Sequence, residues 1–448
     1  MPKGKTPTLL RGMRDILPEE SELWYYVINK ASSISRDYGF TQVETPMLEQ
    51  TSLFVRGLGK DTDVVQKEMF SFEEEGENHI TVRPEMTAGM ARAYIEHGWL
   101  NKPQPVKLFQ IGPCFRHERP QAGRHRQFSQ WDIEVLGYDH PVIDAEVLTM
   151  AYGFFQELGI PVEVQLNSIG TLEFRKSYIH VLQEYYRTRK RNLCLDCKKR
   201  FTRNPLRLLD CKVQACQDMA SDAPIMVDHL DDTSRKRFES VLDHLDHAEV
   251  PYSLNPRLVR GLDYYTHTVF EFFAEGEEGI SQGALLSGGR YDGLLEELGG
   301  RETPGCGFAA GIERIVMRIR ERMQKGEFML PLESVDFYVA QLGEQPRKRA
   351  LHLFELLRRE GLNVSQNFSR NGLKAQLSQA AKLNAKFTLI FGQKELMDNT
   401  VLIRDMENGS QEVVDFKKIA REAKKRLEKW IPRSTPPSKP LEEQSHES

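Results

Sequence analysis

The stretch FRHERPQAGRHRQFSQWDIE, residues 115–134, decides the fold that we predict for this chain. Before it, from Pro105 on, apolar and polar residues alternate with the period of two that a half-buried strand requires. The alternation resumes along RQFSQWDIEVLG. The connecting segment HERPQAGRH is too long and too basic for a tight hairpin. We therefore expect two antiparallel strands joined by a projecting loop.

The second of these strands has two unlike faces. Trp131, Ile133 and Val135 share one face, which is largely apolar. Gln130 and Glu134 share the other face, which is polar. A solvated sheet face beside a charged loop is the ordinary interpretation of such an alternation. The pattern also suits the floor of a site for a polar ligand, with loop cations that hold its phosphates.

Length and composition set the broad class of protein. At 448 residues the chain exceeds the size at which single cores stop growing, so we expect two or three domains. No apolar run approaches the roughly 18 residues of a membrane span, and the first ten residues lack a signal-peptide core. We therefore expect a cytoplasmic protein. A net charge of -4 neither supports nor excludes RNA, which would have to contact local basic patches.

The pattern outside the strand pair indicates the domain organisation. A strand–helix–strand–helix–strand order begins at Val335, and a hairpin with its turn at Asn408–Gly409 closes it. Residues 171–256 are helical and charged, and they separate two β-rich portions of one sheet. The predicted fold class is α+β, with a catalytic core at residues 1–330 that contains a helical insertion at about 171–256, an α/β domain at 331–430, and a disordered Pro- and Ser-rich tail at 431–448.

Several motifs, in order along the chain, carry a family resemblance. FRHE, the basic loop and RQF resemble motif 2 of class II aminoacyl-tRNA synthetases, and GFAAGIER (307–314) resembles their motif 3. LVRGLDYYTHTVFEF (258–272) and LLSGGRYDGLL (285–295) are similar to two peptides that mark histidyl-tRNA synthetases. RGMRDILP and TVRPEMTAG also match that family. The resemblance implies a class II antiparallel-sheet catalytic core and identifies the C-terminal domain as an anticodon-binding domain.

The resemblance also implies the reaction. L-Histidine would react with ATP, assisted by Mg²⁺, to give histidyl-adenylate, and histidine would then pass to tRNA(His) with release of AMP and pyrophosphate. In the family the enzyme is a homodimer, joined through the helix and strand that end here at Pro46. Attack of a carboxylate on the α-phosphate brings two anions together, so positioning and fixed positive charge must supply most of the catalysis. Arg116 and Arg260 are implied as the catalytic cations.

The other site residues follow from the resemblance position by position. An imidazole ring offers a donor and an acceptor on opposite sides, so a selective pocket needs a fixed carboxylate or amide and a hydroxyl. The implied residues are Glu85, Thr87, Gln130, Glu134, Tyr264 and Tyr265 for histidine; Arg116, Arg124, Phe128 and Arg314 for ATP; and Arg119 and Gln121 for the acceptor end of the tRNA.

Two questions stay open at the level of sequence. Cys194, Cys197, Cys211 and Cys216 have a spacing close to that of zinc ribbons, but the family does not imply a metal, so structural zinc and reduced thiols are equal alternatives. No metal ligand is assigned in the catalytic site. The rival function is a catalytically inactive, synthetase-like regulatory or tRNA-sensing protein. Such proteins lose catalytic arginines or the anticodon domain, and this chain keeps both.

Overall fold

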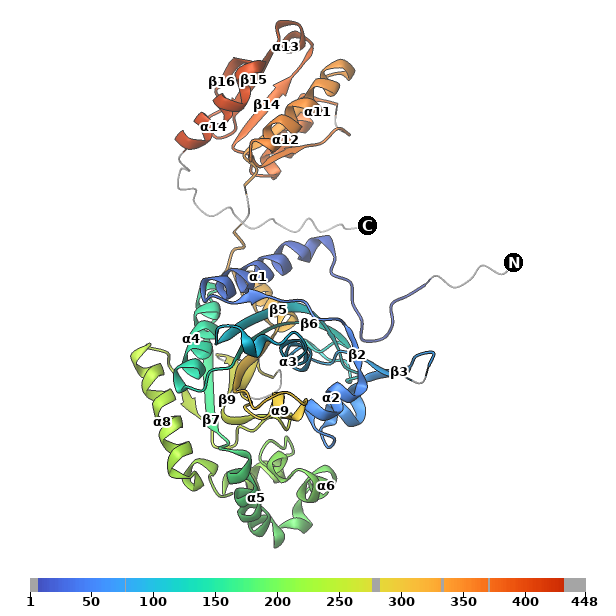
Figure 1. Ribbon diagram of the computed structural model, residues 1–448. Helices are drawn as coiled ribbons and strands as arrows, with labels where there is room; N and C mark the ends of the chain where they lie inside the picture. The colour runs from blue at the N-terminus through green and yellow to red at the C-terminus, as the bar shows by residue number, and fades with distance from the viewer. Residues whose placement is uncertain (1–6, 77, 276–282, 332–333, 370, 431–448) are drawn as a thin grey trace, which may run out of the picture. The chain divides into compact units, whose positions relative to one another are not determined.

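The chain divides between Leu330 and Pro331 into two compact units, which are described separately (Figure 1). Among the described helices, none has the length and apolar character needed to cross a membrane. The tail predicted to be disordered lies outside the described residues. The computed structural model describes residues 7–76, 78–275, 283–331, 334–369 and 371–430.

The first unit is built around an eight-stranded sheet with the order β1-β5-β6-β11-β10-β9-β7-β8 (Figure 1). Its strands are β1 (Thr41–Gln42), β5 (Val106–Phe115), β6 (Gln127–Leu136), β7 (Val162–Ser168), β8 (Ser253–Leu254), β9 (Thr266–Ala274), β10 (Leu286–Arg290) and β11 (Gly305–Gly311). β1 with β5 and β7 with β8 pair in parallel, and the other pairs are antiparallel. β5 and β6 pair along their whole length, which confirms the predicted strand pair. A separate sheet contains β2 (Leu48–Gln50), β4 (His79–Val82) and β3 (Phe70–Glu73).

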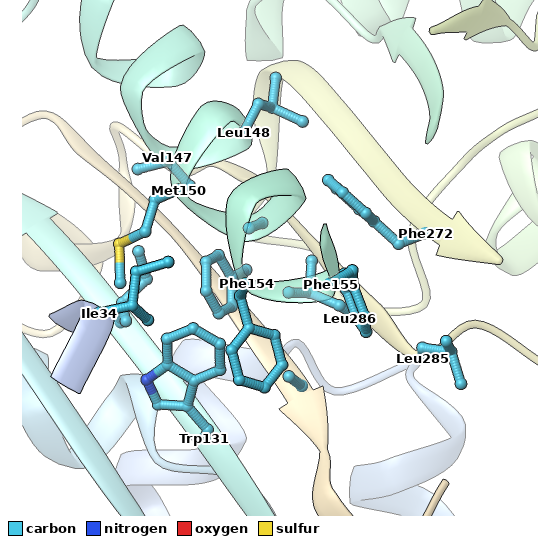
Figure 2. Packing of buried hydrophobic residues seen from close by; sticks show 14 of the residues in the cluster. Ile34, Trp131, Val147, Leu148, Met150, Phe154, Phe155, Phe272, Leu285 and Leu286 are labelled. Atoms are coloured by element: carbon cyan, nitrogen blue, oxygen red, sulfur yellow. The ribbon is translucent and has the colours of Figure 1, made fainter. Parts of the chain in front are cut away.

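One face of the large sheet is apolar and packs against α1 (Pro18–Asp37), α4 (Pro141–Glu157), α8 (Asp232–His247) and α10 (Ile312–Gln324). Trp131 on β6 lies in this core, with its ring centroid 4.6 Å from that of Phe154 and 4.9 Å from that of Phe308. Figure 2 shows Trp131, Phe154 and Ile34 packed together. The Trp131 indole N–H donates to Ser35 Oγ at 3.0 Å, so its polar atom is satisfied. The predicted inward face of the strand is confirmed.

The second core lies around the opposite, more polar face of the sheet. It includes α2 (Thr51–Leu58), α3 (Thr87–Glu96) and α9 (Leu294–Glu297), together with the insertion, which is green in Figure 1. The insertion contains α5 (Leu172–Arg187), η3 (Lys190–Asn192), α6 (Leu195–Arg203), η4 (Pro205–Leu208), α7 (Gln214–Ser221) and η5 (Met226–His229). α8 belongs to the same predicted segment, but it packs against α4 in the first core. The short helices η1 (Val64–Glu68) and η2 (Trp99–Asn101) complete the unit.

The second unit holds a five-stranded sheet with the order β13-β12-β14-β15-β16. Its elements are β12 (Phe337–Gln341), α11 (Glu344–Arg359), β13 (Val364–Gln366), α12 (Leu373–Lys382), β14 (Phe387–Phe391), α13 (Gln393–Asp398), β15 (Thr400–Asp405), β16 (Gln411–Asp415), η6 (Phe416–Lys418) and α14 (Ile419–Lys429). β12 pairs in parallel with β13 and β14, as predicted. The predicted hairpin is also present, and Gly409 has the positive φ of 76° that its turn requires.

A buried ion pair ties α4 to the large sheet. Asp144 on α4 and Arg290 at the end of β10 both have fully buried side chains, and Arg290 Nη2 lies 2.5 Å from Asp144 Oδ1. Thr268 Oγ1 donates to Asp144 Oδ2 at 2.8 Å, and Arg290 Nη1 donates to Asp292 Oδ1 at 3.0 Å. Burial by itself raises the pKa of Asp144, but the adjacent guanidinium outweighs it, and the pKa lies below its ordinary value.

Asp144→Asn is expected to destabilise the first unit by about 3 kcal/mol, because it leaves the buried Arg290 charge without its main partner. Urea unfolding at pH 7, followed by tryptophan fluorescence, measures the loss. Since the folded pKa of Asp144 is lowered, its stabilisation is present above the unfolded pKa and disappears as the pH falls through the folded pKa. The difference in free energy of unfolding between the wild type and Asp144→Asn should therefore become smaller at acidic pH. Asp139→Asn, at an exposed partner of Arg290, should cost below about 1 kcal/mol. Equal losses would contradict the argument.

Candidate active site

A cleft over the polar face of the large sheet brings together most of the residues predicted to bind ligands. It consists of a cavity of about 340 Å³ and a smaller one, and Arg116, Arg124 and Gln130 line both. Of the other predicted residues, the first cavity is lined by Glu85, Thr87, Glu134, Arg260, Tyr264 and Tyr265, and the second by Phe128 and Arg314. Arg119 and Gln121 line neither cavity. They are exposed on the loop after β5, where Arg124 N–H donates to Gln121 O at 2.9 Å.

Small residues on β11 leave the space that the cleft occupies. Gly307 stands opposite Glu134 in the strand register, and Ala309 stands opposite Asp132. A Cβ atom at Gly307 would collide with the Glu134 carboxylate. The small residues of the peptide that resembles motif 3 therefore leave room for a ligand beside the polar face of β6.

Glu134 and three tyrosines form one end of the cleft. Glu134 is buried, and the Tyr291 hydroxyl donates to its Oε2 atom. Burial, with like charge from the neighbouring Asp132 carboxyl, holds the pKa of Glu134 well above its ordinary value. The ring centroids of Tyr264 and Tyr265 lie 4.6 Å apart, and Tyr264 meets Tyr291 edge to face at 5.6 Å. Tyr291 was not among the predicted site residues, although the peptide LLSGGRYDGLL contains it.

Two acceptors flank this end. The carboxylate of Glu85 accepts the N–H groups of Thr87 at 2.9 Å and Ala88 at 2.8 Å, at the start of α3. Burial raises the pKa of Glu85. Gln130 Oε1 is buried and has no hydrogen-bond partner within the described part of the chain. A buried acceptor without a partner is costly, so this oxygen is suited to a donor supplied by a ligand.

Arg116 and Arg260 both line the larger cavity, from opposite sides of β6 and β11: Arg116 follows β5, and Arg260 contacts β9 and β10. Arg260 is held between Glu271, with Nη1 2.5 Å from Oε1, and Ser287, whose Oγ accepts from Nη2 at 2.9 Å. Arg116 donates from Nε to Pro84 O at 2.8 Å, and its guanidinium lies 5.4 Å from the Phe128 ring centroid. Sequence reasoning did not identify Glu271 or Ser287, because alternation on β9 and β10 shows which face they occupy but not which cation they meet.

Positive charge collects at the other end of the cleft. Arg314, in the first turn of α10, donates from Nη1 to Ala284 O and from Nε to Gly123 O at 3.4 Å. Its pKa is lowered by burial and then by the neighbouring Arg124. The ion pair of Arg124 with Glu118 is long, at 3.4 Å between Nη1 and Oε2. Several partly buried arginines in one place repel one another, and an anionic ligand would relieve that repulsion.

Comparisons with known proteins agree across both units. The family model described as Histidyl-tRNA synthetase matches residues 12–315, and the model described as Anticodon binding domain matches residues 336–426. The curated histidine–tRNA ligase of Natranaerobius thermophilus is 42% identical over 92% of this chain and 98% of its own length. That of Syntrophotalea carbinolica is 44% identical over 92% and 96%. The solved structure of apo S. aureus histidyl-tRNA synthetase has a TM-score of 0.76 and 33% identity, and it covers 94% of this chain and 100% of that chain. This chain belongs to the histidyl-tRNA synthetase family.

Proposed function

We propose that this chain uses ATP to convert L-histidine to histidyl-adenylate and then transfers histidine to tRNA(His), releasing AMP and pyrophosphate. The chain is an aminoacyl-tRNA synthetase by family, and its curated relatives are histidine–tRNA ligases over more than nine-tenths of its length. The observation that carries the proposal is the division of the cleft. One end holds a buried carboxylate among tyrosines, the other holds arginines, and Arg116 and Gln130 belong to both cavities.

Arg116 and Arg260 are proposed to stabilise the reacting centre. The histidine carboxylate and the ATP α-phosphate must approach each other, and negative charge builds on the phosphate oxygens. The Nε–H of Arg116 donates to the Pro84 carbonyl, and this hydrogen bond orients the guanidinium. Its two Nη groups would then contact ligand oxygens. Arg260 is oriented by Glu271 and Ser287 on the opposite side of β6 and β11. Two cations fixed before the reaction lower the barrier without reorganising during it.

The second cavity is proposed to hold the rest of ATP. Phe128 and Arg314 both line it, so the adenine ring would lie between an aromatic ring and a guanidinium. Arg124 would bind the outer phosphates. Glu118 and Glu271 line the space beside Arg124 and Arg314, and these oxygen donors fit Mg²⁺, which prefers one or two carboxylates together with phosphates. When bound there, Mg²⁺ would neutralise charge on the phosphate oxygens.

The first cavity is proposed to select histidine. Glu134 and Tyr265 would contact the two ring nitrogens, with Tyr264 packed alongside. The substrate ammonium group needs acceptors, and the unpartnered Gln130 Oε1 provides one, beside Glu85 and Thr87. A side chain without matching donors and acceptors would leave these buried groups unpaired and would bind poorly.

The tRNA and a second copy of the chain are the proposed macromolecular partners. Arg119 and Gln121 are exposed on the loop after β5, where an acceptor end could reach them, and the second unit, by family an anticodon-binding domain, would hold the anticodon stem. The cytoplasm is the proposed compartment. A homodimer is also proposed, because large apolar side chains are exposed along the N-terminal segment and β2. They include Leu9, Leu10, Leu17, Tyr25, Met47 and Leu48. Sedimentation of the purified chain would measure the dimer.

The experiment that tests the function is exchange of pyrophosphate into ATP by the purified chain, run with each of a panel of amino acids. Exchange is expected with histidine and with none of the others, and charging of tRNA(His) is measured next. Absence of exchange with every amino acid, from protein shown to be folded by circular dichroism, would contradict the proposal and favour the inactive, synthetase-like regulator.

A further inference from the structure

We propose that the insertion holds a structural Zn²⁺ ion bound by four cysteine thiolates. The ligands are Cys194, Cys197, Cys211 and Cys216, whose Sγ atoms all lie within 4.8 Å of one another. Cys197, Cys211 and Cys216 are buried and Cys194 is half-buried. The inference concerns the stability of the insertion and does not depend on the proposed reaction.

The spacing of the sulfurs matches metal ligation and not covalent pairing. A tetrahedral zinc site with Zn–S bonds of about 2.3 Å separates its sulfurs by about 3.8 Å. Cys194 Sγ and Cys211 Sγ are 3.9 Å apart. A disulfide requires about 2.05 Å, so these two sulfurs are not bonded. All four sulfurs therefore lie close enough together for one zinc ion to bind them after small side-chain movements.

The backbone around the cluster is arranged for negatively charged sulfur. Cys194 is the residue that caps α6, and its Sγ accepts the N–H of Cys197 at 3.4 Å. The N–H of Cys194 in turn donates to Cys216 Sγ at 3.4 Å. Donors of this kind stabilise thiolates and orient them toward a metal.

Ordinary hydrophobic burial does not explain the convergence of these residues. Free cysteine often behaves as a small apolar side chain, and the other two cysteines fit that description. Cys114 is buried on β5 and Cys306 is buried on β11, each without another cysteine beside it in the described structure. In the insertion, by contrast, four thiols meet from the start of α6, the segment after η4 and the first turns of α7. Four thiolates favour a soft ion that accepts tetrahedral coordination, and Zn²⁺ is the usual ion of structural four-cysteine sites.

The metal would also fix one wall of the cleft. α6 and α7 have nine and eight residues, and helices this short need tertiary interactions to persist. The chain between Cys197 and Cys211 carries Arg207, which contacts Asp210 at 2.8 Å and lies 3.8 Å from Asp63. Arg207 and Asp63 both line the larger cavity of the active site. Zinc therefore holds the segment that places this ion pair at the cleft.

Metal analysis of the purified full-length chain by mass spectrometry tests the proposal. About one zinc per chain is expected in the wild type, and almost none in Cys197→Ser or Cys211→Ser. Cys306→Ala removes a buried cysteine outside the cluster and should keep the zinc. Iron in place of zinc, four free thiols without metal, or disulfides between these cysteines would each overturn the proposal.

A second measurement keeps the test valid if the serine variants fail to fold. In the wild-type chain, titration with an organomercurial should release zinc in step with modification of the cluster thiols, and Co²⁺ exchanged into the site should show the visible absorption of tetrahedral thiolate coordination. Removal of zinc should open the segment between Arg189 and Asp222 to proteolysis, and added Zn²⁺ should reverse this. Release of zinc without thiol modification, or unchanged proteolysis after removal, would contradict a structural site.

Discussion

Replacing Arg260 by alanine is expected to lower histidine-dependent exchange of pyrophosphate into ATP by about 10²–10³-fold, the usual cost of removing one fixed donor from a charge-stabilising site. The guanidinium is half-buried, so solvent screens its charge only weakly. Its hydrogen bonds to Glu271 and Ser287 fix its position. Alanine leaves the developing charge on the α-phosphate with only Arg116 on the opposite side of β6 and β11. Most of the loss should therefore fall on kcat.

Two further variants separate catalysis from folding. Arg260→Lys keeps the charge but not the planar fork that contacts two oxygens at once, so its activity should lie between wild type and alanine. Arg257→Ala removes an exposed arginine three residues earlier in the same loop and should leave exchange nearly unchanged. Equal activity of Arg260→Ala and wild type, or equal losses in Arg260→Ala and Arg257→Ala, would refute the role of Arg260.

Local sequence patterns were sufficient to predict the central strand pair, β5 with β6, and the two faces of β6. The alternation around Trp131 and Glu134 predicted both which residues enter the helix-covered core and which lie in the cleft, because side chains on a strand alternate regardless of what they contact. The strand–helix order after Val335 was equally informative. α14 was not predicted, although Ile419, Ala423 and Leu427 recur at helical spacing along it.

Pairings between distant segments could not be predicted in this way. Glu134 meets Tyr291, and Asp144 meets Arg290, across more than a hundred residues of sequence. Periodicity determines the face on which a residue lies but not its partner on another strand or helix. The same limit applied to the cysteines of the insertion. Their spacing left zinc and free thiols equally open, and only the fold brought all four sulfurs within 4.8 Å.

Glu134→Ala is expected to lower kcat/KM for histidine by about 5–150-fold, because it leaves a buried N–H of the substrate ring without its acceptor, which costs about 1–3 kcal/mol. The KM for ATP should change little, because ATP is proposed to occupy mainly the other cavity. Tyr291→Phe removes the hydroxyl that donates to Glu134 but keeps the carboxylate, so its loss should be much smaller. A similar loss in both variants would indicate that Glu134 only supports the packing of the tyrosines.

Glu134→Gln makes the sharper comparison, because it should lose activity and gain stability together. Burial raises the folded pKa of Glu134 well above the unfolded value, so the folded chain binds a proton that the unfolded chain releases. Between those two pKa values the free energy of unfolding of the wild type falls as the pH rises. Glutamine does not titrate, so the variant does not lose stability in this way. The variant should therefore be more stable than the wild type at pH 8, by a margin that shrinks toward pH 4. Urea unfolding across that range measures it. A residue that only packs against its neighbours has no reason to lower the stability in this way. A carboxyl group that binds the N–H of a ligand ring does, because its function requires it at this position.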